Sequence, residues 1–182
     1  MKFLITGSCG FIGFHVTQKI LEKKTNKVIG IDNLNSYYDV KLKKNRLKLL
    51  KKNKNFQFNK IDLIDINNLK KIFKINKFDV VINLAAQAGV RYSILNPNIY
   101  FESNVIGFYN ILNLSKEYKV KHFLYASTSS VYGMSKKFPL NENMNTDKPL
   151  SFYAATKKTN EVMAYSYSKI YKLRTTGLRF FT

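Results

Sequence analysis

The feature that most constrains the fold is a glycine-rich loop close to the N-terminus. Gly7, Gly10 and Gly13 form a G-x-x-G-x-x-G pattern that follows an apolar, β-prone stretch and leads into apolar residues at helical spacing. Glycines in this arrangement permit a tight turn and a close backbone approach, so that a pyrophosphate can lie at the helix N-terminus. The next apolar stretch ends at Asp32, where dinucleotide-binding proteins place the carboxylate that holds the ribose hydroxyls. Because a carboxylate repels the additional phosphate of NADP, the pattern predicts a site for NAD.

The rest of the chain continues the alternation of strands and helices. A near-continuous apolar run at 78–84 is typical of a strand buried on both faces, and Asp65 is expected to cap the helix that follows it. Strands are predicted at 2–6, 27–31, 56–59, 78–84, 121–126 and 173–178, and helices after Gly13, at 40–52, 66–75 and 97–119, and around Tyr153. This alternation predicts an α/β fold of the Rossmann type, a doubly wound parallel sheet of six strands in the order 3-2-1-4-5-6. We expect residues 1–182 to form a single domain.

Composition argues against several other classes of function. The lone Cys9 excludes an internal disulfide and a multi-cysteine zinc site, and two separated histidines, His15 and His122, give no basis for a metal site. No apolar run approaches the ~20 residues that span a bilayer, and the N-terminal apolar run is too short for a signal peptide. We therefore expect a cytoplasmic protein with no membrane partner. The net charge of +20 comes mostly from lysines spread over predicted solvated helix faces, which favours attraction of a small anionic substrate over binding of nucleic acid.

A second pattern carries catalytic chemistry. Tyr153 and Lys157 stand at i and i+4 of a predicted helix, so their side chains share one face. A nearby ammonium favours the phenolate and lowers a tyrosine pKa from about 10 towards neutrality, which would make Tyr153 a general base. Four hydroxyl residues at 127–130 follow the predicted strand 121–126, at the sheet edge where open α/β folds bind ligands.

Further residues at this edge are candidates for cofactor contacts. Asp62, at the end of the third strand, either meets the adenine or begins the next helix. Ala85 and Ala86 follow the fourth strand, and their small side chains would let a dinucleotide pass close to the backbone.

Taken together, these patterns resemble the extended short-chain dehydrogenase/reductase family, also described as the NAD-dependent epimerase/dehydratase family. The nearest resemblance is to its nucleotide-sugar epimerases, in particular those that act on UDP-glucuronate. The resemblance is carried by the stretches GFIGFHV, GIDNLNSYYDVKL, NLAAQAGVRYSILNP, YASTSSVYG, SFYAATKKTNE and TTGLRFFT, which cover nearly the whole chain.

The resemblance implies a role for each matching position. The implied catalytic residues are Thr128, Tyr153 and Lys157. The implied cofactor-binding residues are Gly7, Gly10, Phe11, Ile12, Gly13, Asp32, Asn33, Asp62, Leu63, Ala85, Ala86 and Lys157. The implied substrate-binding residues are Gln87, Arg91, Ser129 and Ser130.

Two of these residues distinguish among the reactions of the family. Dehydratases of the family carry an Asp-Glu pair after the catalytic threonine, whereas this chain has Ser129 and Ser130, which lack a pKa near neutrality and can donate hydrogen bonds to a carboxylate. The resemblance therefore implies a 4-epimerase that converts UDP-glucuronate to UDP-galacturonate through a transient 4-keto sugar with tightly bound NAD. Other NAD-dependent nucleotide-sugar epimerases remain an alternative.

Members of the family are longer than this chain. We expect most of their small C-terminal substrate region to be missing, so that the chain is truncated at the C-terminus relative to the family. It is then either part of an epimerase or an NAD-binding module without catalysis of its own that acts through a partner chain. The resemblance also implies a homodimer formed by the helix at 97–119 and the helix that carries Tyr153.

Overall fold

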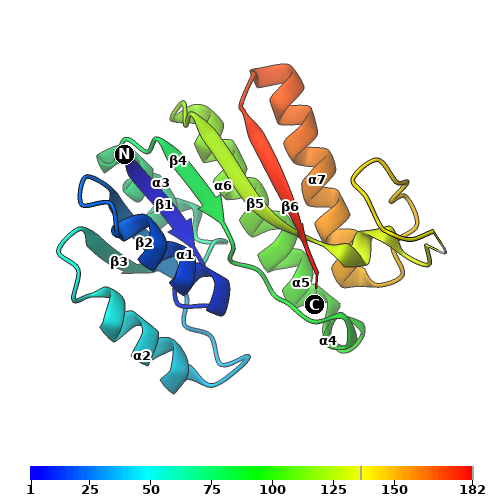
Figure 1. Ribbon diagram of the computed structural model, residues 1–182, viewed down its shortest axis with the longest axis horizontal. Coiled ribbons are helices and arrows are strands. Elements are labelled where there is room, and N and C mark those ends of the chain that lie inside the picture. The colour runs from blue at the N-terminus through cyan, green and yellow to red at the C-terminus, as the bar shows by residue number, and fades with distance from the viewer. Residues whose placement is uncertain (136, 182) are drawn as a thin grey trace.

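The computed structural model describes residues 1–135 and 137–181. Six parallel strands form one sheet in the order β3-β2-β1-β4-β5-β6, which confirms the predicted order (Figure 1). Their bounds are β1 Lys2–Thr6, β2 Lys27–Asp32, β3 Phe56–Lys60, β4 Val80–Asn83, β5 His122–Thr128 and β6 Thr175–Phe180. Within the described residues, no helix is long and apolar enough to cross a membrane.

Helices follow the strands and cover both faces of the sheet. The α-helices are α1 Phe11–Leu21, α2 Val40–Leu50, α3 Ile66–Ile75, α4 Val90–Leu95, α5 Pro97–Tyr100, α6 Gly107–Glu117 and α7 Phe152–Tyr171. A π-helical segment, η1 Phe101–Ile106, joins α5 to α6, and a 3-10 helix, η2 Ser129–Tyr132, follows β5. Asp65 caps α3 as predicted, because its carboxylate accepts a hydrogen bond from the Asn68 backbone N–H at 3.1 Å.

The core consists of two layers, one on each side of the sheet. Leu4 packs with residues of α3, α6 and α7, whereas the next residue, Ile5, packs with residues of α1 and α2. Successive side chains of a strand point to opposite faces, so both residues are fully buried. This two-sided burial explains why the strands near the middle of the sheet are continuous apolar runs.

The structure differs from the predicted elements most clearly at η1, α4, β5 and β6. The helix predicted at 97–119 contains the π-helical segment η1, and α4 lies where no helix was predicted. The strand β5 extends through Thr128, because Ser127 and Thr128 pair with Arg179 and Phe180 of β6. Such pairing is invisible to a local pattern, and for the same reason β6 begins and ends two residues later in the chain than the predicted strand at 173–178.

Candidate active site

The glycine loop forms a tight cradle between β1 and α1. Gly7 has a φ of 69°, and a Cβ on it would lie 2.8 Å from the backbone nitrogen of Ala85. A Cβ on Gly13 would lie 2.1 Å from the Gly7 carbonyl oxygen, so a side chain fits at neither position. Phe11 and Ile12 begin α1 with exposed side chains, and the N–H groups of this first helical turn have no helical partner. The loop therefore has the shape and the free donors that a pyrophosphate needs.

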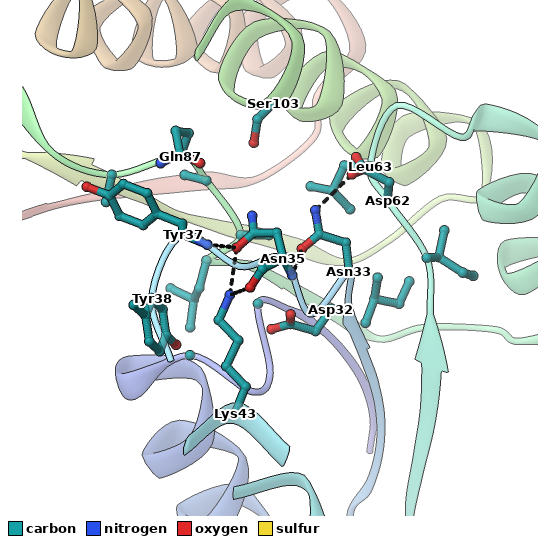
Figure 2. Close-up of a pocket in the computed structure, with 18 residues that line it drawn as sticks. Asp32, Asn33, Asn35, Tyr37, Tyr38, Lys43, Asp62, Leu63, Gln87 and Ser103 are labelled. Atoms are coloured by element: carbon teal, nitrogen blue, oxygen red, sulfur yellow. Dashed lines mark hydrogen bonds between the residues drawn. The ribbon is translucent and has the colours of Figure 1, made fainter. Parts of the chain in front are cut away.

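A cavity of about 230 Å³ extends from this loop along the carboxyl edge of the sheet (Figure 2). It collects most of the residues predicted to bind the cofactor. Those residues are Gly7, Gly10, Asp32, Asn33, Asp62, Leu63, Ala85 and Ala86. Gln87, predicted to bind substrate, lines the same cavity.

Asp32 is buried at the end of β2 and is held by backbone donors. Its Oδ2 accepts a hydrogen bond from the Cys9 N–H at 3.1 Å, and its Oδ1 accepts one from the Leu34 N–H at 2.8 Å. Asp62 lies beside it through Asn33, whose Nδ2 donates to the Asp62 Oδ2 at 2.8 Å. The two carboxylates thus line one wall of the cavity, which fits the hydroxyl-rich end of a dinucleotide.

Lys43 of α2 is a cavity residue that the sequence patterns did not reveal. Its side chain is buried, and its Nζ donates to the Asn35 carbonyl oxygen at 2.9 Å and to the Asn35 Oδ1 at 2.7 Å. Burial lowers the pKa of Lys43, although Asp32 acts in the opposite direction. The contact fixes the segment after β2 that carries Tyr37 and Tyr38 over the cavity (Figure 2).

Gln87 has a fixed backbone and a free side-chain amide. Asn104 of η1 holds the backbone, since its Oδ1 accepts from the Gln87 N–H at 2.7 Å and its Nδ2 donates to the Gln87 carbonyl at 3.0 Å. The Gln87 Nε2 is buried and has no hydrogen-bond partner among residues 1–135 and 137–181. A buried donor of this kind is costly unless a ligand or water satisfies it, so the amide fits a polar group in the cavity. Asn104 was missed by the sequence analysis, and its only signal was an amide inside an apolar helix pattern.

Thr128, Tyr153 and Lys157 come together where β5 meets α7. The Ser151 hydroxyl caps α7 by accepting from the Ala154 N–H at 3.1 Å, and the Tyr153 N–H donates to the Ser93 hydroxyl at 3.1 Å. Lys157 is buried and its Nζ donates to the Ala126 carbonyl oxygen at 3.0 Å. These contacts direct α7 so that one face of its first turns meets the carboxyl end of β5.

The prediction that Tyr153 has a lowered pKa is wrong for this structure. Burial raises the pKa of Tyr153, and a hydrogen bond with Thr128 offsets this only in part. Burial also lowers the pKa of Lys157 to about 8, because its ammonium is removed from water and is satisfied by one carbonyl. The i, i+4 spacing of Tyr153 and Lys157 therefore does not by itself lower the pKa of the phenol.

The remaining predicted substrate residues lie in two environments. Ser129 and Ser130 are half-buried in η2 beside Thr128, whose hydroxyl donates to the Ser130 Oγ and accepts from the Ser130 N–H, both at 3.2 Å. Arg91 is exposed on α4, next to Tyr92, which packs between Tyr37 and Tyr100. The structure therefore joins the serines to Thr128, whereas Arg91 lies on the surface.

Comparisons with known proteins show the family of the chain. The family model described as GDP-mannose 4,6 dehydratase matches residues 4–182. Protein CapI of Staphylococcus aureus is 53% identical over 182 residues, covering 100% of this chain and 54% of its own length. A probable UDP-glucuronate 4-epimerase of Rhizobium meliloti is 44% identical, covering 100% of this chain and 53% of its own.

A solved structure shares the fold. The UDP-glucuronic acid 4-epimerase of Bacillus cereus, crystallised with UDP-glucuronic acid and NAD, has a TM-score of 0.90 at 34% identity and covers 100% of this chain and 57% of its own. The chain thus spans about half the length of the curated relatives it matches.

Proposed function

Because the chain belongs to the GDP-mannose 4,6 dehydratase family, we propose that it carries the NAD-dependent 4-epimerase chemistry that converts UDP-glucuronate to UDP-galacturonate. The observation that carries the proposal is the run of Thr128, Ser129 and Ser130 beside Tyr153, in which two neutral donors occupy the positions where a dehydratase needs acids. Relatives that are UDP-glucuronate 4-epimerases support the same substrate.

The cofactor site is proposed to hold NAD through backbone and carboxylate contacts. The loop of Gly7, Gly10 and Gly13, with the first turn of α1, would meet the pyrophosphate, and Asp32 would accept hydrogen bonds from the adenosine ribose. Asp62 and Asn33 would border the adenine, and the free amide of Gln87 would donate to a polar group farther along the dinucleotide.

The catalytic residues of the chain would accept one proton from the substrate and return it. Bound NAD supplies a hydride acceptor that returns the same hydride, so that the cofactor is regenerated in each cycle. Tyr153 accepts the proton of the sugar C4 hydroxyl as that carbon is oxidised to a ketone, and it returns the proton when the ketone is reduced on its other face. Thr128 lowers the pKa of Tyr153, and the Lys157 ammonium would stabilise negative charge on the Tyr153 oxygen.

The serines of η2 are proposed to bind the substrate carboxylate. A 4-keto uronic acid is a β-keto acid and loses CO2 readily when its carboxylate can rotate freely. Hydrogen bonds from Ser129 and Ser130, with Arg91 as a further cation, would hold the carboxylate and restrain that loss. No acid is needed at these positions, which separates epimerisation from dehydration.

The same proposal includes a homodimer that works in the cytoplasm, with residues 1–182 acting as one NAD-binding unit. Exposed apolar residues on two adjacent helices support the dimer, namely Tyr109 of α6 and Val162 and Tyr165 of α7. An association of this kind would bury these side chains in a helix-to-helix interface.

The proposal is tested by incubating the purified protein with UDP-glucuronate and separating the products. We expect UDP-galacturonate to form, with NAD retained by the protein and UDP-glucose, which has no carboxylate, turned over more slowly. Release of CO2 or of a deoxy sugar would contradict epimerisation. Because the chain spans about half of its relatives, the assay is run on the chain alone and with the remaining half of the Staphylococcus aureus relative added as a separate polypeptide. NAD binding without turnover in both assays would instead support a cofactor-binding module.

A further inference from the structure

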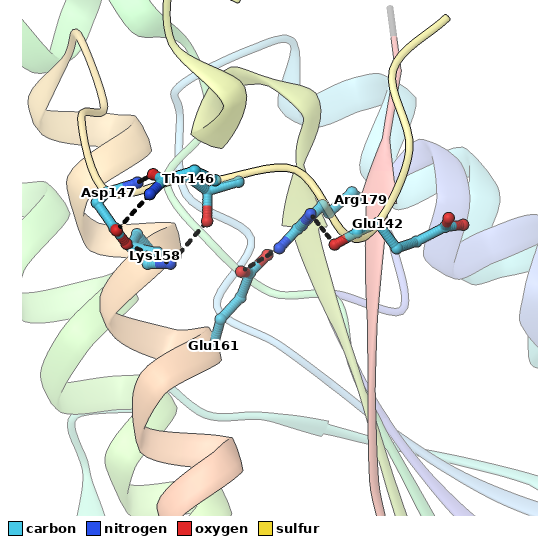
Figure 3. Close-up of polar contacts among 7 residues, drawn as sticks. Glu142, Thr146, Asp147, Lys158, Glu161 and Arg179 are labelled. Atoms are coloured by element: carbon cyan, nitrogen blue, oxygen red, sulfur yellow. Dashed lines mark hydrogen bonds and ion pairs between the residues drawn. The ribbon is translucent and has the colours of Figure 1, made fainter.

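A partly buried ion pair lies one helical turn beyond the proposed catalytic residues of α7. Glu161 and Arg179 of β6 form two parallel hydrogen bonds of 2.9 Å, from Arg179 Nε to Oε1 and from Arg179 Nη2 to Oε2 (Figure 3). The side chains are 14% and 20% exposed, so the pair is largely removed from solvent. A planar, bidentate pair of this kind fixes orientation as well as distance.

Glu161 also contacts the strand that ends in the catalytic threonine. The Ser127 hydroxyl donates to the Glu161 Oε1 at 2.6 Å, and Ser127 is the register partner of Arg179 in the sheet. One carboxylate is therefore attached to two adjacent strands at the same level. Ser127 directly precedes Thr128, so this attachment lies next to the catalytic group.

Three side chains on one face of α7 contact three consecutive residues of β5. Thr128 lowers the pKa of the Tyr153 hydroxyl, Lys157 donates to the Ala126 carbonyl and Glu161 accepts from Ser127. Positions i, i+4 and i+8 of a helix lie in a row, so the contacts set how α7 lies against the strand. The third contact takes no part in the proton transfer proposed above.

We propose that Glu161 and Arg179 are positioning residues that hold α7 against the carboxyl ends of β5 and β6 and thereby keep the Tyr153 hydroxyl against Thr128. The inference rests on the proposed function in that Tyr153 is its base. Arg179 extends the same arrangement, because its Nη1 donates to the Glu142 carbonyl at 3.3 Å and its guanidinium lies 4.9 Å from the centre of the Tyr132 ring. A buried ion pair adds little to stability on average, so a geometric role is the better account of it.

The charges around Tyr153 and Glu161 make the direction of a change in the Tyr153 pKa a test of the proposal. Glu161 faces Arg179 of β6, Tyr125 of β5 and Lys158 of its own helix, and Tyr153 faces Tyr100 and Thr128. Burial raises the pKa of Glu161, but the hydrogen bonds from Arg179 and Ser127 outweigh it and leave the pKa lowered. Replacing Glu161 by Gln removes a negative charge, which on electrostatic grounds alone lowers the pKa of Tyr153. Loss of position acts in the opposite direction, because Tyr153 then loses the Thr128 hydrogen bond that lowers its pKa.

The experiment measures the ionisation of Tyr153 in the full chain by NMR with a carbon-13 label at tyrosine Cζ. The chain has 12 tyrosines, and the Tyr153 signal is assigned by its loss in Tyr153→Phe. Titrations are run without and with saturating NAD, and each variant is compared with the wild type in the same state. In Glu161→Gln we expect the Tyr153 pKa to rise. A pKa that falls, as charge alone requires, or that stays unchanged, as a purely structural role requires, would overturn the proposal.

Matched variants separate position from charge and from folding. Ser127→Ala changes no charge and should also raise the Tyr153 pKa, and Arg179→Lys, which keeps the cation but loses the bidentate contact, should do the same. Thr146→Val is the control, because it removes a hydroxyl that accepts from Lys158 of α7 at 2.6 Å but belongs to the loop before α7 and not to β5 (Figure 3). It should leave the Tyr153 pKa in place, and an equal shift in this control would count against the proposal.

These readouts are independent of turnover. NAD affinity of the wild type reports on the proposed function, whereas the difference between Ser127→Ala and Thr146→Val reports on positioning. Should Glu161→Gln fail to fold, the comparison of Ser127→Ala with Thr146→Val still decides the matter, since both changes are small and neutral.

Discussion

Two regions along the carboxyl edge of the sheet are built in different ways: the glycine loop with Asp32, here called the cofactor end, and the junction of α7 with β5 and β6, here called the catalytic end after its proposed role. At the cofactor end, Gly7, Gly13 and Asp32 belong to one strand–turn–helix–strand unit, in which Gly13 packs against Gly7 and Asp32 accepts from Cys9, and Gly7 also packs against the backbone of Ala85. At the catalytic end, the helix α7 is held by partners far away in the chain, such as Ser127 and Arg179. The first region depends on backbone shape and the second on side-chain contacts between separate elements. Substitutions are therefore expected to damage one region without the other.

The largest effect is expected from removing the base. Tyr153→Phe removes the phenolic hydroxyl and keeps the ring, whose centre lies 6.1 Å from the centre of the Tyr100 ring. We expect kcat for epimerisation to fall by about 10²- to 10⁴-fold, the usual contribution of a general base. The affinity for NAD, measured by calorimetry on the same sample, should stay within twofold, because Tyr153 does not line the cofactor cavity. A parallel loss of NAD affinity would contradict the separation of the two regions.

The next effect concerns Lys157 and the dependence of stability on pH. Burial lowers its pKa to about 8 from 10.5, so between these values the unfolded chain binds more protons than the folded one. Stability should therefore rise as the pH increases from about 8 towards 10.5, by about 3 kcal/mol over the full window at about 1.4 kcal/mol per pKa unit. Below pH 8 both states are protonated and Lys157 contributes no slope.

The check is urea unfolding at pH 8 and pH 10 of the wild type and of Lys157→Met. Because raised tyrosine pKa values act in the opposite direction at high pH, only the difference between the two proteins is interpreted. The wild type should gain stability relative to the variant between the two pH values. If the unfolding free energies of the two proteins change equally between the two pH values, folding does not lower the pKa of Lys157.

The same contrast explains what the sequence could predict. The glycine cradle, the acid at the end of β2 and the cap of α3 follow from local pattern, because Gly7, Asp32 and Asp65 each stand at a strand or helix end that the pattern marks, although the close approach of Gly7 to Ala85 exists only after β4 packs beside β1. The strand order also followed, because short right-handed crossovers leave few alternatives. Asn104 and Glu161 could not be predicted, since each works by contacts that exist only after distant elements pack together.

The prediction of a lowered Tyr153 pKa was wrong for a related reason. The i, i+4 spacing places Lys157 correctly on the helix, but the sequence does not say how deeply the pair is buried. Desolvation depends on every element around α7, and here it raises the pKa of the phenol instead of lowering it.

A substitution at the cofactor end should reverse the pattern expected for Tyr153→Phe. Asp32→Asn removes the charge that would hold the ribose hydroxyls and keeps the size of the side chain. We expect NAD affinity to fall by about 10- to 100-fold, as for loss of a hydrogen bond to a charged group, and the preference for NAD over NADP to shrink. Calorimetric titration of both dinucleotides checks this, and an unchanged ratio of the two affinities would mean that Asp32 does not meet the ribose.

The smallest effect separates the shape of the cradle from its charge. Gly13→Ala places a Cβ 2.1 Å from the Gly7 carbonyl oxygen, so backbone must move, whereas a Cβ on Gly10 would lie 3.1 Å from the same atom, a tight contact that a shift of a few tenths of an ångström relieves. We expect Gly13→Ala to cost about 1–3 kcal/mol of unfolding free energy, as overpacking does, and Gly10→Ala much less. Urea unfolding of both variants without cofactor measures this. The Tyr153 signal should keep its position in both, because α7 packs on β5 and β6, which lie on the far side of β4 from the cradle. A shift in Gly13→Ala alone would mean that the two ends are mechanically coupled through β1 and β4.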